Sequence, residues 1–122
     1  MAAKDDLGRA GEARAARYLE TIGCTIVDRN WRCRDGELDL VATTPTSLLI
    51  VEVKTRRGAG YGHPLEAIDP VKQTRLWRLG MAWIAAHRDV VQGRRLQFAA
   101  IGLTGPDPAT AVLDFVPDLE LR

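Results

Sequence analysis

Apolar residues recur at helical spacing in two segments and alternate with polar residues in five others. Residues 6–23 carry an apolar stripe beside a charged face, with an aspartate as N-cap and Gly23 as the terminating residue, which predicts a helix. A second helix is predicted to begin at Asp69-Pro70, an N-cap followed by proline in the first turn, and to end near residue 87 or 88. Its predicted core stripe consists of Leu76, Leu79, Trp83 and Ala86.

Five segments have the alternation or the β-branched content of strands: residues 24–31, 36–42, 47–55, 96–103 and 111–116. The turn between the second and third segments is short, which predicts an antiparallel hairpin. Strict alternation in the second strand puts its odd-numbered and even-numbered residues on opposite faces: Glu37, Asp39 and Val41 against Leu38, Leu40 and Ala42. The order α-β-β-β-α-β-β predicts an α/β fold, a mixed sheet with helices packed on it.

The length and composition exclude several classes of protein. A chain of 122 residues with 46% apolar residues is expected to form a single domain over residues 1–122, with its core at about 7–103. No apolar run approaches the ~18–20 residues of a membrane span, and the first residues lack the apolar region of a secretory signal. The two cysteines form neither a disulfide scaffold nor a zinc motif. We therefore expect a cytoplasmic protein without membrane association.

Basic residues are concentrated in the middle of the chain. Residues 29–95 carry twelve basic and seven acidic side chains, although the whole chain has a net charge of only +1. This distribution is typical of a polyanion partner such as nucleic acid. A basic, glycine-rich loop at residues 56–62 is either a phosphate-contacting surface or an ordinary solvated loop, and the second helix would extend that surface. The candidate contact residues are Arg56, Arg57, Lys72, Arg75 and Arg78.

Charged residues interrupt a strand that otherwise has the pattern of a buried one. Within Leu-Leu-Ile-Val-Glu-Val-Lys, Glu52 and Lys54 break an aliphatic run suited to a central strand. Residues two apart in a strand share a face, and paired strands lie about 4.8 Å apart, so Asp39, Glu52 and Lys54 are predicted to converge. Two carboxylates and a lysine suit a divalent cation and phosphoryl chemistry. The alternative is a Glu52–Lys54 ion pair on an edge strand, which contributes little to stability.

Several motifs of this chain resemble those of the YraN-like family of small bacterial proteins. The resemblance covers about residues 7–101, and its strongest part is the pair of strand motifs around Asp39 and Glu52. The matching segments are Leu7-Gly-Arg-Ala-Gly-Glu12, Asn30-Trp31-Arg32, Gly36-Glu-Leu-Asp39-Leu-Val, Val51-Glu-Val-Lys-Thr-Arg56 and Lys72-Gln73. That family belongs to the restriction-endonuclease-like PD-(D/E)xK superfamily, together with archaeal Holliday-junction resolvases. The resemblance implies a restriction-endonuclease-like αβββαβ core with a four-stranded mixed sheet flanked by helices, to which the last predicted strand adds a C-terminal strand.

The resemblance also implies roles for individual residues. Asp39 and Glu52 match the metal ligands, which implies Mg²⁺ or Mn²⁺ as cofactor, and Lys54 matches the catalytic lysine. Glu12 matches the acid on the first helix that completes the site in resolvase-like relatives. Glu37 matches a family-typical acid expected to support the ligands.

Two further positions bear on the site. Gln73 is either a hydrogen-bond partner of the site, through water or backbone, or an ordinary surface residue. Many relatives have Arg-Phe-Asp where this chain has Gln97-Phe98-Ala99. The change to Ala99 removes a carboxylate from that strand and leaves Asp39, Glu52 and Lys54 intact.

Three hypotheses of function follow. The first is a Mg²⁺- or Mn²⁺-dependent endonuclease that hydrolyses phosphodiester bonds in DNA, rather than RNA, in repair or recombination. Structure-selective cutting is expected because the sequence has no evident recognition helix for base readout. The second is a nucleic-acid-binding adaptor that keeps the nuclease-like fold without turnover. The third is a dimeric structural protein whose apolar helix pairs across a two-fold axis, although a homodimer is compatible with all three.

Overall fold

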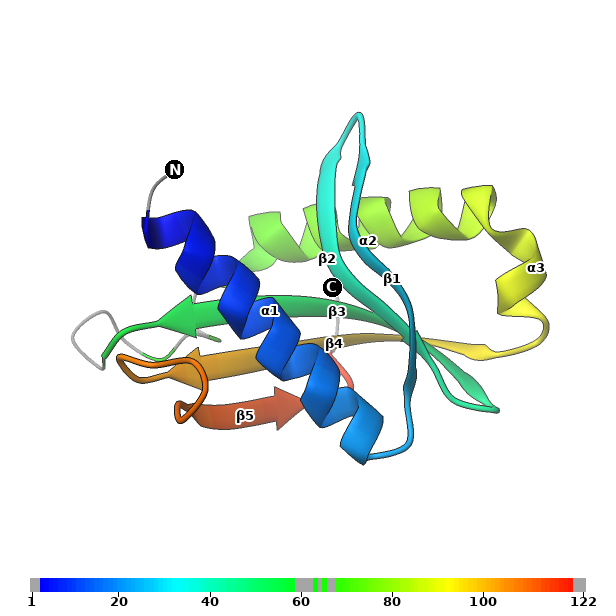
Figure 1. The fold of residues 1–122 in the computed structure, drawn as a ribbon. Helices are drawn as coiled ribbons and strands as arrows, with labels where there is room; N and C mark the ends of the chain where they lie inside the picture. Colours follow the sequence, from blue (N-terminus) through cyan, green and yellow to red (C-terminus); the bar gives the residue numbers. More distant parts are fainter. Residues whose placement is uncertain (1–2, 59–62, 64, 66–67, 120–122) are drawn as a thin grey trace.

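A single mixed sheet carries helices on both of its faces (Figure 1). The computed structural model describes residues 3–58, 63, 65 and 68–119. Its elements are α1 (Ala3–Thr21), β1 (Thr25–Cys33), β2 (Gly36–Thr43), β3 (Ser47–Arg56), α2 (Pro70–Ala86), α3 (Arg88–Val91), β4 (Arg95–Thr104) and β5 (Val112–Val116). The strand order is β1-β2-β3-β4-β5, in which β3 and β4 are parallel and the other neighbours are antiparallel. The predicted α/β class and αβββαβ order are confirmed, and β5 is the C-terminal strand that extends the sheet.

The second helix begins as the sequence predicts. Asp69 is the N-cap, its Oδ1 accepts a 3.0 Å hydrogen bond from the backbone N–H of Lys72, and Pro70 occupies the first turn. The short helix α3 was not predicted, because four residues are too few to show a helical period. Among the described helices, none combines the length and the apolar character that crossing a bilayer requires.

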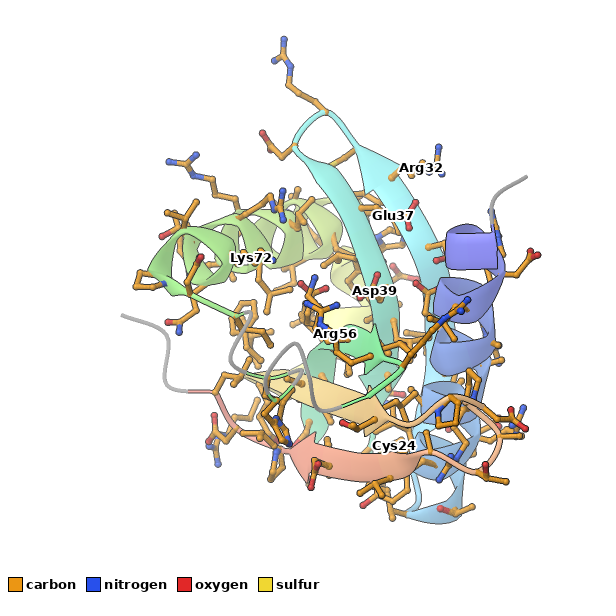
Figure 2. All side chains as sticks on the ribbon, turned by 90° about the vertical axis from the view of Figure 1, so that its left-hand side faces the viewer. Cys24, Arg32, Glu37, Asp39, Arg56 and Lys72 are labelled. Atoms are coloured by element: carbon orange, nitrogen blue, oxygen red, sulfur yellow. The ribbon has the colours of Figure 1, made fainter. Side chains whose placement is uncertain are left out.

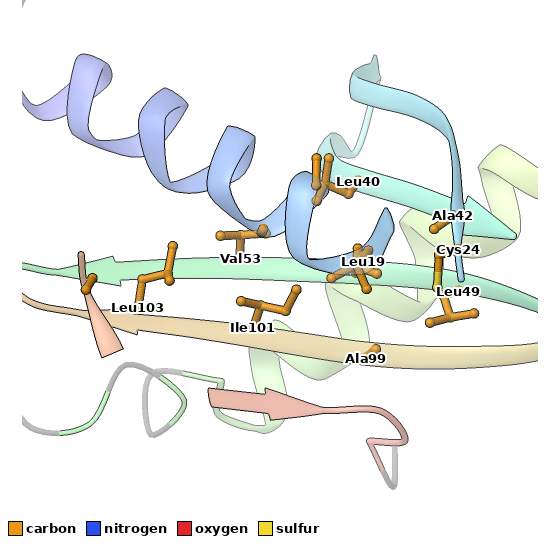
Figure 3. Packing of buried hydrophobic residues seen from close by; sticks show 13 residues of the cluster. Leu19, Cys24, Leu40, Ala42, Leu49, Val53, Ala99, Ile101 and Leu103 are labelled. Carbon is orange, nitrogen blue, oxygen red and sulfur yellow. The ribbon is translucent and has the colours of Figure 1, made fainter. Parts of the chain in front are cut away.

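One face of the sheet is covered by α1, which crosses in front of it in Figure 1. We call the buried residues of this side the α1-side cluster; it joins Leu19 of the helix to residues of β2, β3 and β4 (Figure 3). Gly11 allows the close approach of α1, because a Cβ at this position would collide with the side chain of Thr55 on β3. The glycine therefore brings its neighbour Glu12 near the centre of the sheet.

The opposite face is covered by α2, whose buried residues form the α2-side cluster with β2, β3 and β4. Leu76, Leu79 and Trp83 lie in this cluster as predicted, whereas Ala86 is exposed at the last position of the helix. The indole Nε1 of Trp83 donates a 2.8 Å hydrogen bond to Asp28 of β1. This bond ties α2 to the β1–β2 hairpin.

The alternation predicted for β2 is wrong at Asp39. Leu40 and Ala42 belong to the α1-side cluster, whereas Leu38 belongs to the α2-side cluster together with Val41. Residues two apart share a face in a regular strand, so β2 switches faces between Leu38 and Leu40. Asp39 lies at the point of the switch.

Candidate metal centre

The hydrogen-bonded pairing of β2 with β3 ends next to Asp39. The predicted antiparallel hairpin is confirmed, with pairs running from Thr43–Leu48 to Leu40–Val51. Beyond the last of these pairs, the Oδ2 atom of Asp39 accepts a 2.8 Å hydrogen bond from the backbone N–H of Val53. A side chain therefore takes the place of the backbone ladder, and the tip of the β1–β2 hairpin separates from β3 (Figure 1).

A pocket of about 280 Å³ opens where the two strands separate. It contains the three residues that the sequence predicted to converge: Asp39, Glu52 and Lys54. Lys54 Nζ lies 3.9 Å from Glu52 Oε2, and the two side chains are only 22% and 15% exposed. At this level β3 is paired only with β4, but the low exposure of both side chains shows that they do not form the solvent-exposed ion pair of the alternative interpretation. The lining residues are Gly36, Glu37, Asp39, Glu52, Val53, Lys54, Lys72, Arg75, Leu76 and Leu79.

The carboxyl group of Asp39 is strongly biased towards its neutral form. Burial is the largest cause, followed by a hydrogen bond to Glu52 and by the charge of Glu52, and together they raise the pKa of Asp39 to about 9. The Val53 N–H acts in the opposite direction, and Glu12 adds a further repulsion. Asp39 therefore holds a proton at neutral pH when no cation balances its neighbours.

Glu12 approaches the carboxyl group of Asp39 from α1, on the opposite side of the sheet from α2. One carboxylate oxygen each of Glu12, Glu37 and Asp39 lie within 4.8 Å of one another. Burial raises the pKa of Glu12 and the charge of Glu37 raises it further, whereas hydrogen bonding to Asp39 and Asn30 and the charge of Arg9 lower it. The helix and the strand thus bring three acidic groups together.

Glu37 is held by a residue of the neighbouring strand. Arg32 pairs with Glu37 across the β1–β2 ladder, and its Nε donates a 2.7 Å hydrogen bond to Glu37 Oε2. The Arg32 side chain is 78% exposed, so this ion pair is solvated and contributes little energy by itself. Its effect is to restrict the position of the Glu37 carboxylate beside Asp39.

The donor set of this cluster fits a hard divalent cation. Asp39 lies in contact with Glu52 on one side and Glu12 on the other, with Glu37 close by. Carboxylate oxygens are the ligands that Mg²⁺ and Mn²⁺ prefer. Carboxyl groups crowded together bind protons to reduce their mutual repulsion. A nearby positive charge stabilises their ionised form instead. Glu12, Glu37 and Asp39 are the described residues whose oxygens lie close enough together to share one ion. Glu52, which the sequence paired with Asp39 as a ligand, lies beside Asp39 but outside this group.

Two predicted phosphate-contacting residues line the same pocket. Lys72 and Arg75 of α2 lie across from the acidic residues of β2, as Figure 2 shows for Lys72, Glu37 and Asp39. Arg56 lies at the end of β3 and Arg57 is exposed beyond it; neither lines the pocket. Residues 59–62 of the predicted basic loop lie outside the described residues.

The remaining predicted positions lie away from the pocket. The side-chain amide of Gln73 donates a 3.4 Å hydrogen bond to the carbonyl of Ile68, and Gln73 is not among the lining residues. Ala99 is fully buried in the α1-side cluster, whereas the pocket opens on the α2 side. An alanine at position 99 therefore leaves the pocket unchanged.

Sequence reasoning missed one residue near the cluster. Hydrogen bonding to Asn30 lowers the pKa of Glu12, and the backbone φ of Asn30, 51°, lies in the left-handed region although the residue stands inside β1. Two signs in the sequence pointed to it: Asn30 belongs to the Asn30-Trp31-Arg32 segment that resembles the family, and asparagine is depleted within strands.

Comparisons with known proteins identify relatives that cover nearly the whole chain. The model of the "Uncharacterised protein family UPF0102" matches residues 11–102. A UPF0102 protein of Paenarthrobacter aurescens is 50% identical over 101 residues, which is 83% of this chain and 84% of the relative. Another from Leifsonia xyli subsp. xyli is 43% identical over 119 residues, or 98% and 99% of the two chains. The pocket residues and Glu12 all fall within the region matched by the family model.

Proposed function

This chain belongs to the UPF0102 family, the YraN-like family that its motifs indicated, and we propose that it is a Mg²⁺- or Mn²⁺-dependent endonuclease acting on DNA. The description of the family states no activity, so the proposal rests on the site. The observation that carries it is the composition of one pocket, in which Asp39, Glu52 and Lys54 face Lys72 and Arg75. A cation-binding acidic group beside basic residues suits a phosphodiester, which needs charge neutralisation and positioning.

In phosphodiester hydrolysis, water adds to phosphorus and releases one proton, one P–O ester bond breaks, and the departing sugar oxygen takes up a proton. When bound, a divalent cation supplies Lewis-acid stabilisation of the charge that develops on the phosphoryl group. The ammonium group of Lys54 donates hydrogen bonds to that same charge or to the attacking water. Glu52 lies 3.9 Å from the Lys54 Nζ and orients it in the pocket.

The basic residues of α2 supply the contacts that hold the backbone of the substrate. Lys72 and Arg75 lie on one wall of the pocket, where they contact phosphates next to the scissile one. These contacts set affinity and register, and they carry no sequence information.

The size of the pocket favours a substrate with an unpaired strand. At about 280 Å³ the pocket has room for a phosphate and part of its sugar, but not for a whole duplex. The reactive side chains are largely buried, so a strand has to enter the pocket to reach them. A regular duplex has to be distorted to do so, whereas a flap, a junction or a single strand is not. We therefore propose structure-selective cutting, in keeping with a role in repair or recombination.

The experiment that tests this function is a cleavage assay on labelled single-stranded, duplex, flap and four-way DNA, with matched RNA. Each substrate is incubated with Mg²⁺, with Mn²⁺ or with a chelator. We expect cleavage with either cation, none with chelator, and loss of cleavage in Asp39→Asn and Glu52→Gln. Glu20→Gln, which changes an exposed carboxylate of α1, is the matched control and should cleave normally.

Other results would change the assignment. Salt-sensitive DNA binding without a product under any condition would favour the nucleic-acid-binding adaptor. Cleavage that persists in both Asp39→Asn and Glu52→Gln would remove these residues from the reaction.

A further inference from the structure

We propose that Asn30 is a positioning residue for the carboxylate cluster, whose left-handed backbone and side-chain amide hold Glu12 of α1 against Asp39 of β2. The functional meaning of this arrangement rests on the proposed metal site, because the cluster would hold the ion. The contact itself is tested in metal-free protein.

The first step concerns the ladder between β1 and β2. Arg29 pairs with Leu40 and Trp31 pairs with Leu38, so Asn30 and Asp39 lie opposite each other between these pairs. Asp39 is the residue at which β2 switches faces. The irregular backbone of Asn30 and the irregular alternation of β2 therefore occur at the same level of the hairpin.

The second step concerns the backbone of Asn30. Its φ is 51°, and among the described residues the only other non-glycine residue with a positive φ is Gln92. Most residues resist this conformation, whereas asparagine adopts it more readily because its short polar side chain bonds locally. The ladder between β1 and β2 continues in register on both sides of Asn30, so the left-handed residue changes the direction of its own side chain without ending the pairing.

The third step is what the switch does to Asp39. In a regular pleat Asp39 would lie on the face opposite both Leu38 and Leu40. Because these neighbours lie on different faces, Asp39 turns towards the edge of β2, where it accepts the hydrogen bond from Val53. From that edge it contacts both Glu52 in the pocket and Glu12 on α1.

The fourth step concerns the side chain of Asn30. Asn30 lies opposite Asp39 on the ladder, and an oxygen of the half-buried Glu12 carboxylate lies within 4.8 Å of an Asp39 oxygen, so the Asn30 side chain stands beside both acids. Hydrogen bonding to Asn30 is one of the causes that lower the pKa of Glu12. An amide is a neutral donor, so it orients the carboxylate without cancelling its negative charge. A lysine or arginine in the same place would compete with a cation for Glu12.

The experiment is a double-mutant cycle of Asn30→Gly and Glu12→Ala, with unfolding by urea measured in chelator. Glycine keeps the left-handed backbone and deletes only the amide, so the cycle isolates the side-chain contact. We expect the two changes to be non-additive. We also expect Mn²⁺ to bind about tenfold more weakly to Asn30→Gly than to the wild type, the loss typical of a group that orients a metal ligand.

Gln92→Gly is the matched control, since it places glycine at the other left-handed position, in the C-cap of α3 and outside the pocket lining. It should bind Mn²⁺ like the wild type. Asn30→Asp is a second variant, because aspartate also adopts the left-handed backbone conformation. It should destabilise the protein at pH 8, and Glu12→Ala should relieve that loss because it removes the like charge.

Additive effects of Asn30→Gly and Glu12→Ala overturn the proposal, as does an Asn30→Asp penalty that persists in Glu12→Ala. If the wild type binds no Mn²⁺ at all, the proposed function fails, and a non-additive cycle still supports the contact between Asn30 and Glu12. The two failures are therefore distinguishable.

Discussion

Asp39 and Val53 are joined by a 2.8 Å hydrogen bond in which a side-chain oxygen accepts from the backbone of the neighbouring strand. The bond satisfies an N–H of β3 just beyond the last paired residues of the β2–β3 ladder. It also fixes an acidic group beside Glu52 in a largely buried place. The hairpin thus keeps its backbone bonded while it opens a pocket, at the cost of crowded carboxyl groups.

Asp39→Asn should stabilise the metal-free protein at pH 8 by about 1–3 kcal/mol. The amide oxygen can still accept from Val53, and the amide NH₂ can donate to Glu52 or Glu12. The folded-state pKa of about 9 lies above the ordinary value of 3.8, so the folded protein holds a proton that the unfolded chain releases between these values. The stability of the wild type should therefore fall as the pH rises from about 4 to about 9.

Urea unfolding in chelator at several pH values measures this effect. The advantage of Asp39→Asn should shrink as the pH falls and approach zero well below the ordinary pKa of 3.8, where the wild-type group is protonated in both states. An advantage that is independent of pH would show that the proton on Asp39 is not its cause.

Lys54→Met should lower the rate of cleavage by about 10²–10³-fold while leaving the fold intact. Methionine keeps much of the length of the side chain and removes the ammonium that lies beside Glu52. Cation affinity should not fall, because the change removes a positive charge from the acidic pocket. Single-turnover rates and Mn²⁺ titration measure the two quantities separately. A variant that loses both together would indicate a structural role for Lys54.

Gly11→Ala should destabilise the protein by about 1–3 kcal/mol, because the added methyl group collides with Thr55 and pushes α1 away from β3. Since Glu12 follows directly, Mn²⁺ binding should weaken as well. Gly8→Ala is the matched control in the same helix: no atom lies within 4 Å of its Cβ position, so it should stabilise by up to about 1 kcal/mol. Urea unfolding measures the free energy of unfolding of both variants. Equal changes in Gly11→Ala and Gly8→Ala would contradict the close approach of α1 to β3.

Lys72→Ala and Arg75→Ala should each weaken DNA binding several-fold and reduce the slope of log K against log salt by about 1. Both side chains line the pocket, so each removes a phosphate contact. Arg17→Ala, on the exposed side of α1, is the control and should change little. Fluorescence anisotropy in chelator at several salt concentrations measures binding without cleavage. An equal loss in Arg17→Ala would indicate a diffuse charge effect.

The parts of the fold that follow from local rules could be predicted from the sequence. The Asp69-Pro70 helix start and the hairpin depend on capping and turn length, and both are confirmed. The charges within an aliphatic run marked Glu52 and Lys54, and the hairpin brought Asp39 beside them; all three line one pocket. The strand period of two did not predict how Asp39 reaches that pocket, because the alternation breaks at this residue.

The remainder depends on contacts that no local pattern contains. Glu12 reaches Asp39 because Gly11 lets a helix approach a distant strand, and the sequence motif indicated this acid only through resemblance. The face switch at Asp39 lies opposite the left-handed Asn30 of the neighbouring strand, a pairing between segments that only the folded hairpin brings together. A periodicity rule assumes a regular pleat and so fails at this level of the hairpin.

The early end of the β2–β3 ladder opposes selection for heat resistance to selection for the proposed cleavage at the same residues. An aliphatic side chain in place of Asp39 would let the pleat continue and relieve the acidic crowding, and it would also remove a ligand of the proposed metal site. Thermotolerant homologues are therefore expected to retain this opening and to gain robustness on outer surfaces instead, for example at the unobstructed Gly8 of α1.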